Sequence, residues 1–199
     1  MPDAIADEKR ALRADLRERR QTLSAQAREA AEAGIHAQLD ALVEQHGARS
    51  ISCYLSTTTE PGTRSFVTDA VGRGIRVLLP VTRADGLLDW AVATPDGDIA
   101  EGLFGLPEPA GALLGPIAVN DVDLLVIPAA AVDHTGMRLG WGRGFFDKTL
   151  GSMERCPPVY AVVFDSEFVD TDLPSDALDQ RVTGVVTPTR TLTLAPTRR

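Results

Sequence analysis

The chain has 199 residues, of which 44% are hydrophobic and 24% charged, a composition typical of one globular domain able to bury its own core. We therefore expect a single domain over residues 1–199. The net charge of −8 argues against general nucleic-acid binding, because such binding depends on basic residues that neutralise phosphates. No apolar run approaches membrane-spanning length, and the charged N-terminus lacks a signal-peptide core. Cys53 and Cys156 lack metal-ligand spacing, which indicates free thiols and a cytoplasmic protein.

Two helices are predicted before the first strand. Residues 4–21 have few apolar positions, but Leu12 and Leu16 lie four residues apart and so share one face. Ser24 is a suitable N-cap for a second helix, and Gly47 is a suitable end. The buried face of that second helix is predicted from apolar residues at steps of three and four, namely Ala27, Ala31, Ile35, Leu39 and Leu42.

From residue 50 onward, short apolar runs alternate with helical or turn-rich segments. The predicted strands are 51–55, 76–81, 87–92, 124–127, 159–164 and 182–187, with a helix over 63–73. The strand that begins at residue 76 is expected to stop at Pro80. The Gly- and Pro-rich residues 94–120 are expected to form an irregular surface excursion, and 190–199 a loose tail. This order predicts a three-layer α/β fold, with a largely parallel sheet and helices on both of its faces.

Ligands of such sheets bind beyond the carboxyl ends of the strands. Three polar or glycine-rich segments follow predicted strands: 56–62, 131–146 and 165–179. We expect these three segments to converge at one edge of the sheet and to form the functional site.

The most informative of these segments runs from Arg138 to Lys148 and has the sequence RLGWGRGFFDK. Its G-x-G-x-G spacing differs from both the dinucleotide-binding fingerprint and the P-loop. Glycines without a Cβ let backbone N–H groups approach an anion, and arginines add forked donors for phosphate oxygens. Asp147 can hold the magnesium ion that accompanies a nucleotide. The segment therefore predicts a phosphate-binding loop that precedes a helix.

The fuller pattern around this loop resembles the signature of the 5-formyltetrahydrofolate cyclo-ligase family, also called 5,10-methenyltetrahydrofolate synthetases. The pattern is Asp133-x-x-Gly136-x-Arg138-Leu139-Gly140-x-Gly142-x-Gly144-aromatic-aromatic-Asp147. Further matches are the basic element at residues 9–13, Tyr54 followed by Glu60 and Thr63, and the element at residues 105–109. The resemblance covers about residues 9–187.

The resemblance implies an enzyme that uses ATP and Mg²⁺ to convert 5-formyltetrahydrofolate into 5,10-methenyltetrahydrofolate, releasing ADP and phosphate. It implies ATP contacts from Lys9, Arg10, Ala11, Leu12, Arg13, Arg138, Leu139, Gly140, Trp141, Gly142, Arg143, Gly144, Phe145 and Phe146. It implies folate contacts from Leu55, Glu60, Trp141, Arg143 and Phe145. Asp147 and Asp179 are the implied magnesium ligands, and Arg143 is the implied catalytic residue.

Two other functions stay open from the sequence. The family's usual His-Asp pair is here Leu178-Asp179, which suggests a nucleotide- or folate-binding homologue that lacks turnover. Related α/β folds also suggest a sugar-phosphate isomerase, which would not need ATP. In every case we expect small-molecule partners, neither nucleic acid nor a membrane, and a monomeric chain.

Overall fold

The structure is a computed structural model that describes residues 2–153 and 155–194. Its helices are α1 (Pro2–Gln21), α2 (Ala25–His46), α3 (Arg64–Gly72) and α4 (Phe145–Ser152). The strands are β1 (Ser50–Ser52), β2 (Arg76–Thr82), β3 (Leu88–Val92), β4 (Ile99–Glu101), β5 (Pro107–Pro109), β6 (Leu113–Leu114), β7 (Leu124–Pro128), β8 (Ala131–Asp133), β9 (Arg138–Leu139), β10 (Val159–Val162), β11 (Phe168–Val169), β12 (Gly184–Val186) and β13 (Thr191–Thr193). Short 3₁₀ turns are η1 (Leu103–Gly105), η2 (Pro116–Asp121) and η3 (Asp165–Glu167).

An eight-stranded sheet forms the centre of the molecule, in the order β13-β12-β10-β7-β1-β2-β3-β6. The five strands from β12 to β2 are parallel, and β13, β3 and β6 are added antiparallel at the two sides. The predicted α/β class with a largely parallel sheet is confirmed.

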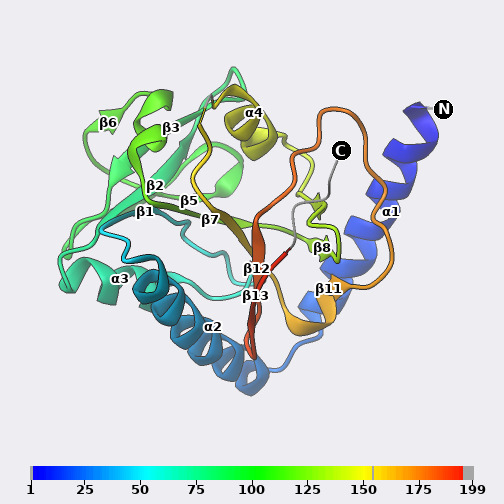
Figure 1. Ribbon diagram of the computed structural model, residues 1–199, viewed down its shortest axis with the longest axis horizontal. Helices are drawn as coiled ribbons and strands as arrows, with labels where there is room; N and C mark the ends of the chain where they lie inside the picture. Colours follow the sequence, from blue (N-terminus) through cyan, green and yellow to red (C-terminus); the bar gives the residue numbers. More distant parts are fainter. Residues whose placement is uncertain (1, 154, 195–199) are drawn as a thin grey trace.

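Helices cover both faces of this sheet (Figure 1). On one face, α2 and α3 pack through residues such as Leu39 and Phe66, both fully buried. On the other face, α4 and η2 pack through Phe145, Leu150 and Val119. Helix α1 lies to the side, beside β8 and β11, where its Leu16 contacts the small sheet rather than the large one.

The second helix begins and ends where its sequence predicts. The Ser24 hydroxyl accepts a hydrogen bond from the Ala27 N–H at 3.1 Å, which satisfies one free donor of the first turn. Gly47 has a left-handed φ of 57° and ends the helix.

Strand β2 continues past Pro80 to Thr82, so its expected stop at the proline is wrong. The parallel pairing with β1 ends at Leu78, opposite Ser52, and β2 then pairs with β3 alone. A proline is compatible with a strand that has a partner on one side only, because its missing N–H costs no hydrogen bond on the open side.

Two other expectations are corrected. Residues 94–120 are not irregular throughout, because β4 and β5 pair there and β6 joins the large sheet. Residues 191–193 are not a loose tail, since β13 pairs with β12. In both cases pairing across the chain gives order to segments whose own sequences are poor in strand signals. The remainder of the expected tail, 195–199, lies outside the described residues.

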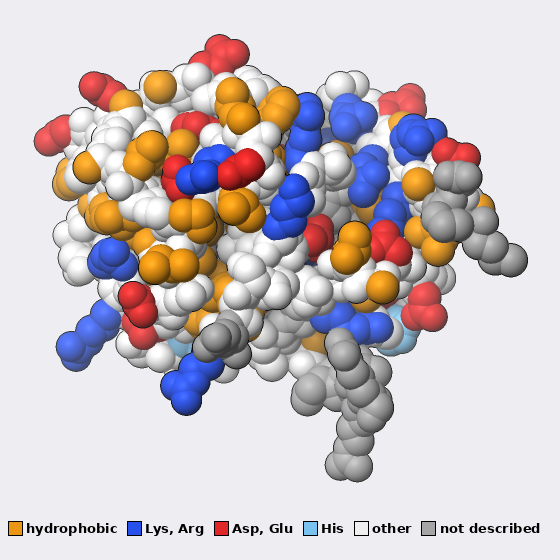
Figure 2. All heavy atoms as spheres, turned by 90° about the horizontal axis from the view of Figure 1, so that it is seen from above, with side chains coloured by type: hydrophobic (Ala, Val, Ile, Leu, Met, Phe, Trp, Pro, Cys, Tyr) orange, Lys and Arg blue, Asp and Glu red, His pale blue; other side chains and the backbone are white. Residues whose placement is uncertain are grey.

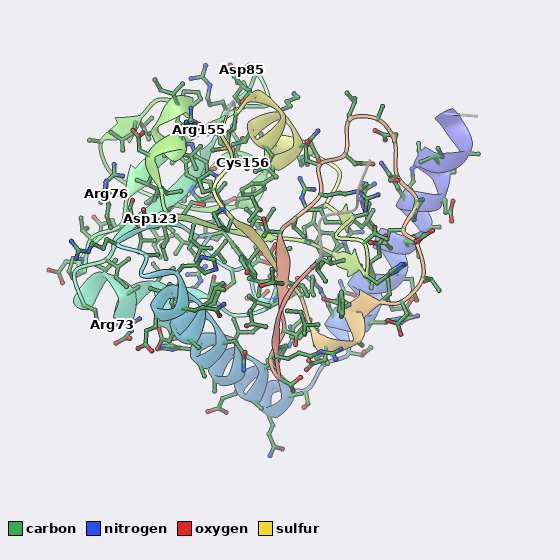
Figure 3. All side chains as sticks on the ribbon, in the orientation of Figure 1. Arg73, Arg76, Asp85, Asp123, Arg155 and Cys156 are labelled. Carbon is green, nitrogen blue, oxygen red and sulfur yellow. The ribbon has the colours of Figure 1, made fainter. Side chains whose placement is uncertain are left out.

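The amino ends of the parallel strands are tied together at the edge remote from the predicted site. The Asp123 carboxylate accepts hydrogen bonds from the backbone N–H groups of Arg49 and Ser50, at 2.8 and 2.9 Å. Arg76 lies at the same edge and is labelled with Asp123 in Figure 3. The carboxyl ends of the strands are thereby left to the longer loops.

The small sheet β11-β8-β9 is held by one buried carboxylate, that of Asp133. Its Oδ1 accepts hydrogen bonds from the Thr135 N–H, the Thr135 hydroxyl and the Met137 N–H, and its Oδ2 accepts one from the Leu173 N–H. Burial alone would raise the pKa of Asp133, but these hydrogen bonds outweigh it and hold the pKa below its ordinary value. Asp133 therefore fixes the β8–β9 turn and the loop that follows β11.

Asp133→Asn should lower the free energy of unfolding at pH 7 by about 2 kcal/mol, because an amide NH₂ cannot accept the bonds that the carboxylate accepts. Since the folded-state pKa is depressed, the carboxylate's contribution is complete above the unfolded pKa of about 4 and is lost as the pH falls through the folded value. Urea unfolding from pH 7 to pH 3 measures both effects. Asp170→Asn, at an exposed position nearby, is the control. Equal stability of the two variants at pH 7 would contradict the prediction.

Candidate functional site

The glycine loop spans the gap between β9 and the first turn of α4, and an ion pair closes it. Arg138, at the start of β9, is buried, and its Nη2 lies 2.8 Å from Oδ1 of Asp147 in α4. The same Asp147 oxygen also accepts the backbone N–H of Gln180 at 3.2 Å. The loop is therefore fastened at both of its ends and to the loop that follows β11.

Two of the three alternating glycines have backbone conformations that other residues rarely adopt. Gly142 has a φ of 92° and Gly144 a φ of 72°, whereas the φ of Gly140 is not positive. A Cβ on Gly142 would also lie 3.3 Å from the guanidinium carbon of Arg13. The loop therefore needs glycine at 142 and 144 for its turns, and at 142 also for the close approach of helix α1.

A cavity of about 510 Å³ lies on one side of the loop. Its walls come from α1, the segment after β1, the ends of β2 and β3, the η1–β5 segment and the glycine loop. The lining residues on which the argument depends are Arg17, Arg20, Tyr54, Leu55, Glu60, Phe104, Glu108, Trp141, Arg143, Phe145 and Phe146. The cavity thus combines apolar and aromatic walls with a few charged groups, as ligand sites usually do.

A second cavity of about 580 Å³ lies on the other side of the same loop. It is more polar, and it is bounded by α1, the N-terminal half of α4 and the segment 176–180. Its lining includes Arg13, Leu139, Gly142, Lys148, Asp176, Leu178 and Asp179. Gly140, Gly144 and Asp147 line both cavities, so the glycine loop separates two adjoining spaces.

Basic side chains gather around a hollow between helix α1 and the rest of the molecule, although the chain as a whole is acidic (Figure 2). The guanidiniums of Arg17, Arg20, Arg138 and Arg143 all belong to residues that line the first cavity. A net negative charge therefore does not prevent a local positive potential at the site.

Helix α1 is attached to the site by its basic residues. The Lys9 ammonium lies 2.7 Å from Asp176 and 2.5 Å from Asp179. Burial works to lower the pKa of Lys9, but its hydrogen bonds to these two carboxylates outweigh burial and raise it above the ordinary value. Arg13 donates from Nε to the carbonyl oxygen of Gly140 at 2.7 Å, so it holds the backbone of the glycine loop.

A buried ion pair supports the aromatic wall of the first cavity. Arg20 binds Glu167 with two hydrogen bonds, Nε to Oε1 at 2.7 Å and Nη2 to Oε2 at 2.8 Å. Its guanidinium carbon lies 4.8 Å from the ring centroid of Trp141 and 5.4 Å from that of Phe164. The cation is therefore held between two aromatic rings, an arrangement that is favourable when the charge is desolvated.

The pterin-side candidates lie together in the first cavity. Glu60 accepts the Thr57 N–H on Oε2 at 2.9 Å, and within the described chain its Oε1 has no hydrogen-bond partner. Burial raises the pKa of Tyr54 well above its ordinary value, so its hydroxyl stays neutral and donates to the Pro61 carbonyl. Leu55 and Phe145 line the same space. The sequence-predicted folate residues are thus brought together at one cavity.

The predicted nucleotide and metal residues are divided between the two cavities. Lys9 and Arg13 hold the segment and the loop that border the second cavity, whereas Arg10, Ala11 and Leu12 line neither. Arg10 instead pairs with Asp7 on the exposed side of α1. Asp147 and Asp179 both line the second cavity, and in each of them one carboxylate oxygen has no hydrogen-bond partner among the described residues.

Four lining residues were not predicted: Arg17, Arg20, Phe104 and Glu108. Glu108 is buried, and its Oε1 accepts hydrogen bonds from the Thr82 N–H and hydroxyl at 2.8 and 2.5 Å. Phe104 is the one non-glycine described residue with a positive φ, 66°, and its ring lies 3.8 Å from the Arg143 guanidinium carbon. The G-L-P-E-P element of the sequence was the available signal for this part of the cavity.

One further group of possible metal ligands lies elsewhere, on α2 and α3. His36, Asp40 and Asp69 place ligand atoms within 4.8 Å of one another. Arg73, labelled in Figure 3, already pairs with Asp40 at 2.5 Å and with Asp69 at 3.2 Å. A bound cation would have to displace this guanidinium, so the group is better described as a surface ion-pair network.

Comparison with known proteins decides between the functions left open by the residues alone. Residues 5–188 match the model of the 5-formyltetrahydrofolate cyclo-ligase family. The chain belongs to this family. The 5-formyltetrahydrofolate cyclo-ligase of Mycolicibacterium smegmatis is 37% identical over 147 residues, which cover 71% of this chain and 75% of that protein. The enzyme of the same name from Haemophilus influenzae is 30% identical, over 70% and 75% of the two chains.

The fold of this cyclo-ligase family member is also that of solved family structures. The 5,10-methenyltetrahydrofolate synthetase of Aquifex aeolicus superposes with a TM-score of 0.79 at 24% identity, over 96% of this chain and 95% of that one. The synthetase of Mycoplasma pneumoniae gives 0.70 at 20% identity, over 90% and 98%. The predicted family, and with it the assignment to a family of ligases, is confirmed.

Two smaller expectations also have an outcome. Cys53 and Cys156 are both free, as their spacing indicates, and burial raises the pKa of the Cys53 thiol to about 12. Within the described residues, no helix combines the length and apolar character needed to cross a bilayer.

Gly142→Ala should destabilise this cyclo-ligase family member by about 1–2 kcal/mol, because a Cβ is strained at positive φ and here also meets Arg13. Gly140→Ala is the matched control, since its φ is not positive and a Cβ there would meet its nearest atom at 3.6 Å. Its effect should stay within about 0.5 kcal/mol. Urea unfolding measures both variants, and equal costs would show that the loop does not need glycine at 142.

Proposed function

We propose that this protein is an ATP- and Mg²⁺-dependent enzyme that converts 5-formyltetrahydrofolate into 5,10-methenyltetrahydrofolate, with release of ADP and phosphate. The observation that carries the proposal is the pair of cavities on opposite sides of one glycine loop. A reaction that joins a nucleotide to a second large substrate needs two such spaces with a shared wall.

The first cavity suits the folate. The aminopyrimidine edge of a pterin offers two parallel N–H donors, and the Glu60 carboxylate can accept both with modest rearrangement. Trp141 and Phe145 provide aromatic surface for the rings, and Leu55 an apolar wall. This arrangement places the formyl group toward the glycine loop if the pterin binds at Glu60.

The second cavity suits the nucleotide. Backbone N–H groups at the start of α4 and the glycines of the loop can bind phosphate oxygens. Asp147 and Asp179 fit a magnesium ion, because each keeps one unpartnered carboxylate oxygen on the same cavity, and Mg²⁺ usually takes one or two carboxylates besides water and phosphate. When bound, the ion would neutralise phosphate charge during transfer.

The chemical difficulty of the reaction is that a formyl amide oxygen is a poor leaving group. Transfer of the γ-phosphoryl of ATP to this oxygen makes it a phosphate ester, N10 then attacks the formyl carbon, and phosphate leaves as the ring closes. Most of the enzyme's work is positioning and stabilisation of charge on the phosphoryl group. Arg143, exposed on the loop between the two cavities, is the residue we assign to that charge.

The direct test follows the absorbance of the methenyl product after 5-formyltetrahydrofolate, ATP and Mg²⁺ are mixed with the protein. Omission of ATP, or chelation of the metal with EDTA, should abolish the signal. A folded protein that binds both substrates without producing the chromophore would instead be the non-catalytic homologue. Turnover without ATP would contradict the phosphoryl-transfer step.

Arg143→Ala should lower kcat by about 10²-fold or more, because it removes a charge that acts on the transition state. The melting temperature should be unchanged, since Arg143 is exposed and its one aromatic contact is with the exposed Phe104. Arg155→Ala removes an equally exposed arginine outside both cavities and is the control (Figure 3). Unfolding of Arg143→Ala, or unaltered kcat, would refute the assignment.

A further inference from the structure

Arg17 differs from the other basic residues of α1 in having no internal partner. Within the described chain no carboxylate lies within 4.0 Å of it, and it makes no side-chain hydrogen bond. By contrast, Arg10 pairs with Asp7, Arg19 with Asp15, and Arg20 with Glu167. The charge of Arg17 is therefore not used to hold the fold.

The position of this free charge is what distinguishes it from an ordinary surface arginine. Arg17 is exposed, yet it lines the first cavity, and its guanidinium carbon lies 5.6 Å from the ring centroid of Trp141. The opposite support of that ring is Arg20, which is itself fixed by Glu167. A rigid aromatic ring thus holds an unpaired cation at the solvent side of the cavity.

Arg17 does not line the second cavity, whereas Arg13, one turn earlier on the same helix, does. The phosphates of a nucleotide in the second cavity are therefore not its natural ligand. An anion at Arg17 must belong to the molecule in the first cavity and must lie at the end that faces water.

We propose that Arg17 binds the carboxylates of the glutamate tail of the folate. This inference rests on the proposed function, which supplies the substrate. The pterin end of a folate bears N–H donors that suit Glu60, and its other end carries carboxylates that are ionised at neutral pH. Arg17 matches that second end in charge, and its guanidinium can bind a carboxylate through two parallel hydrogen bonds.

The test is isothermal titration calorimetry with three probes: 5-formyltetrahydropteroate, which has no glutamate, and the mono- and pentaglutamates of 5-formyltetrahydrofolate. Arg17→Gln should weaken the binding of both glutamate forms about fivefold or more, and leave that of the pteroate unchanged. The wild-type affinity for the pentaglutamate should fall as NaCl is raised from about 50 to 300 mM, because the contact is exposed.

Arg19→Gln is the matched control. It removes the same charge two positions along the helix, from a residue that pairs with Asp15 and does not line the cavity. All three affinities should stay within about twofold of those of the wild type.

The outcomes separate this inference from the function on which it rests. A wild-type protein that binds none of the three probes would refute the proposed function itself. If the wild type binds all three but Arg17→Gln weakens them equally, Arg17 acts on Trp141 rather than on the tail, and the inference is wrong. It is also wrong if Arg17→Gln changes no affinity, or changes only the affinity for ATP.

Discussion

The ion pair between Arg138 and Asp147 is the constraint on which the rest of the site depends. Arg138 precedes the glycine loop and Asp147 follows it, so their contact at 2.8 Å sets the distance that the loop must span. Both side chains are largely buried, and loss of one partner would leave the other charge uncompensated, at a cost of several kcal/mol. With its ends fixed, the loop can satisfy its turns only through left-handed conformations, which explains the glycines at 142 and 144. The two cavities then follow as the spaces on either side of a rigid wall.

One face of helix α1 carries most of the contacts that join this wall to its surroundings. Lys9, Arg13, Arg17 and Arg20 follow one another at steps of four, four and three, which places them on one side of the helix. Three of them are used internally, on Asp176 and Asp179, on the Gly140 carbonyl and on Glu167. The helix has little apolar surface of its own apart from Leu16 and its neighbours, so charge-assisted hydrogen bonds rather than hydrophobic burial position it.

The sequence predicts the sheet and the loop well, because their signals are local. Apolar runs of strand length define β7 and β10, and the glycine spacing defines the loop. Arg20 could not be found in this way: it lies among five charged or polar neighbours on a helix, a pattern that also describes a solvated face, and its partner Glu167 lies 147 residues away. Glu108 and Phe104 were missed for a related reason, since β4 and β5 order their segment by pairing with each other, and neither strand is distinctive alone.

The replacement of the usual histidine by Leu178 can now be weighed against the contacts of Asp179. The carboxylate of Asp179 is oriented by Lys9 and by the Asp176 N–H, and neither contact involves the side chain at 178. Leu178 is 78% exposed and lines the second cavity, so its side chain faces the space for a ligand and not the core. The substitution therefore leaves the position of the second carboxylate intact and changes what that cavity presents to its occupant. Any effect on turnover should accordingly appear in the binding of the nucleotide or its metal before it appears in the stability of the fold.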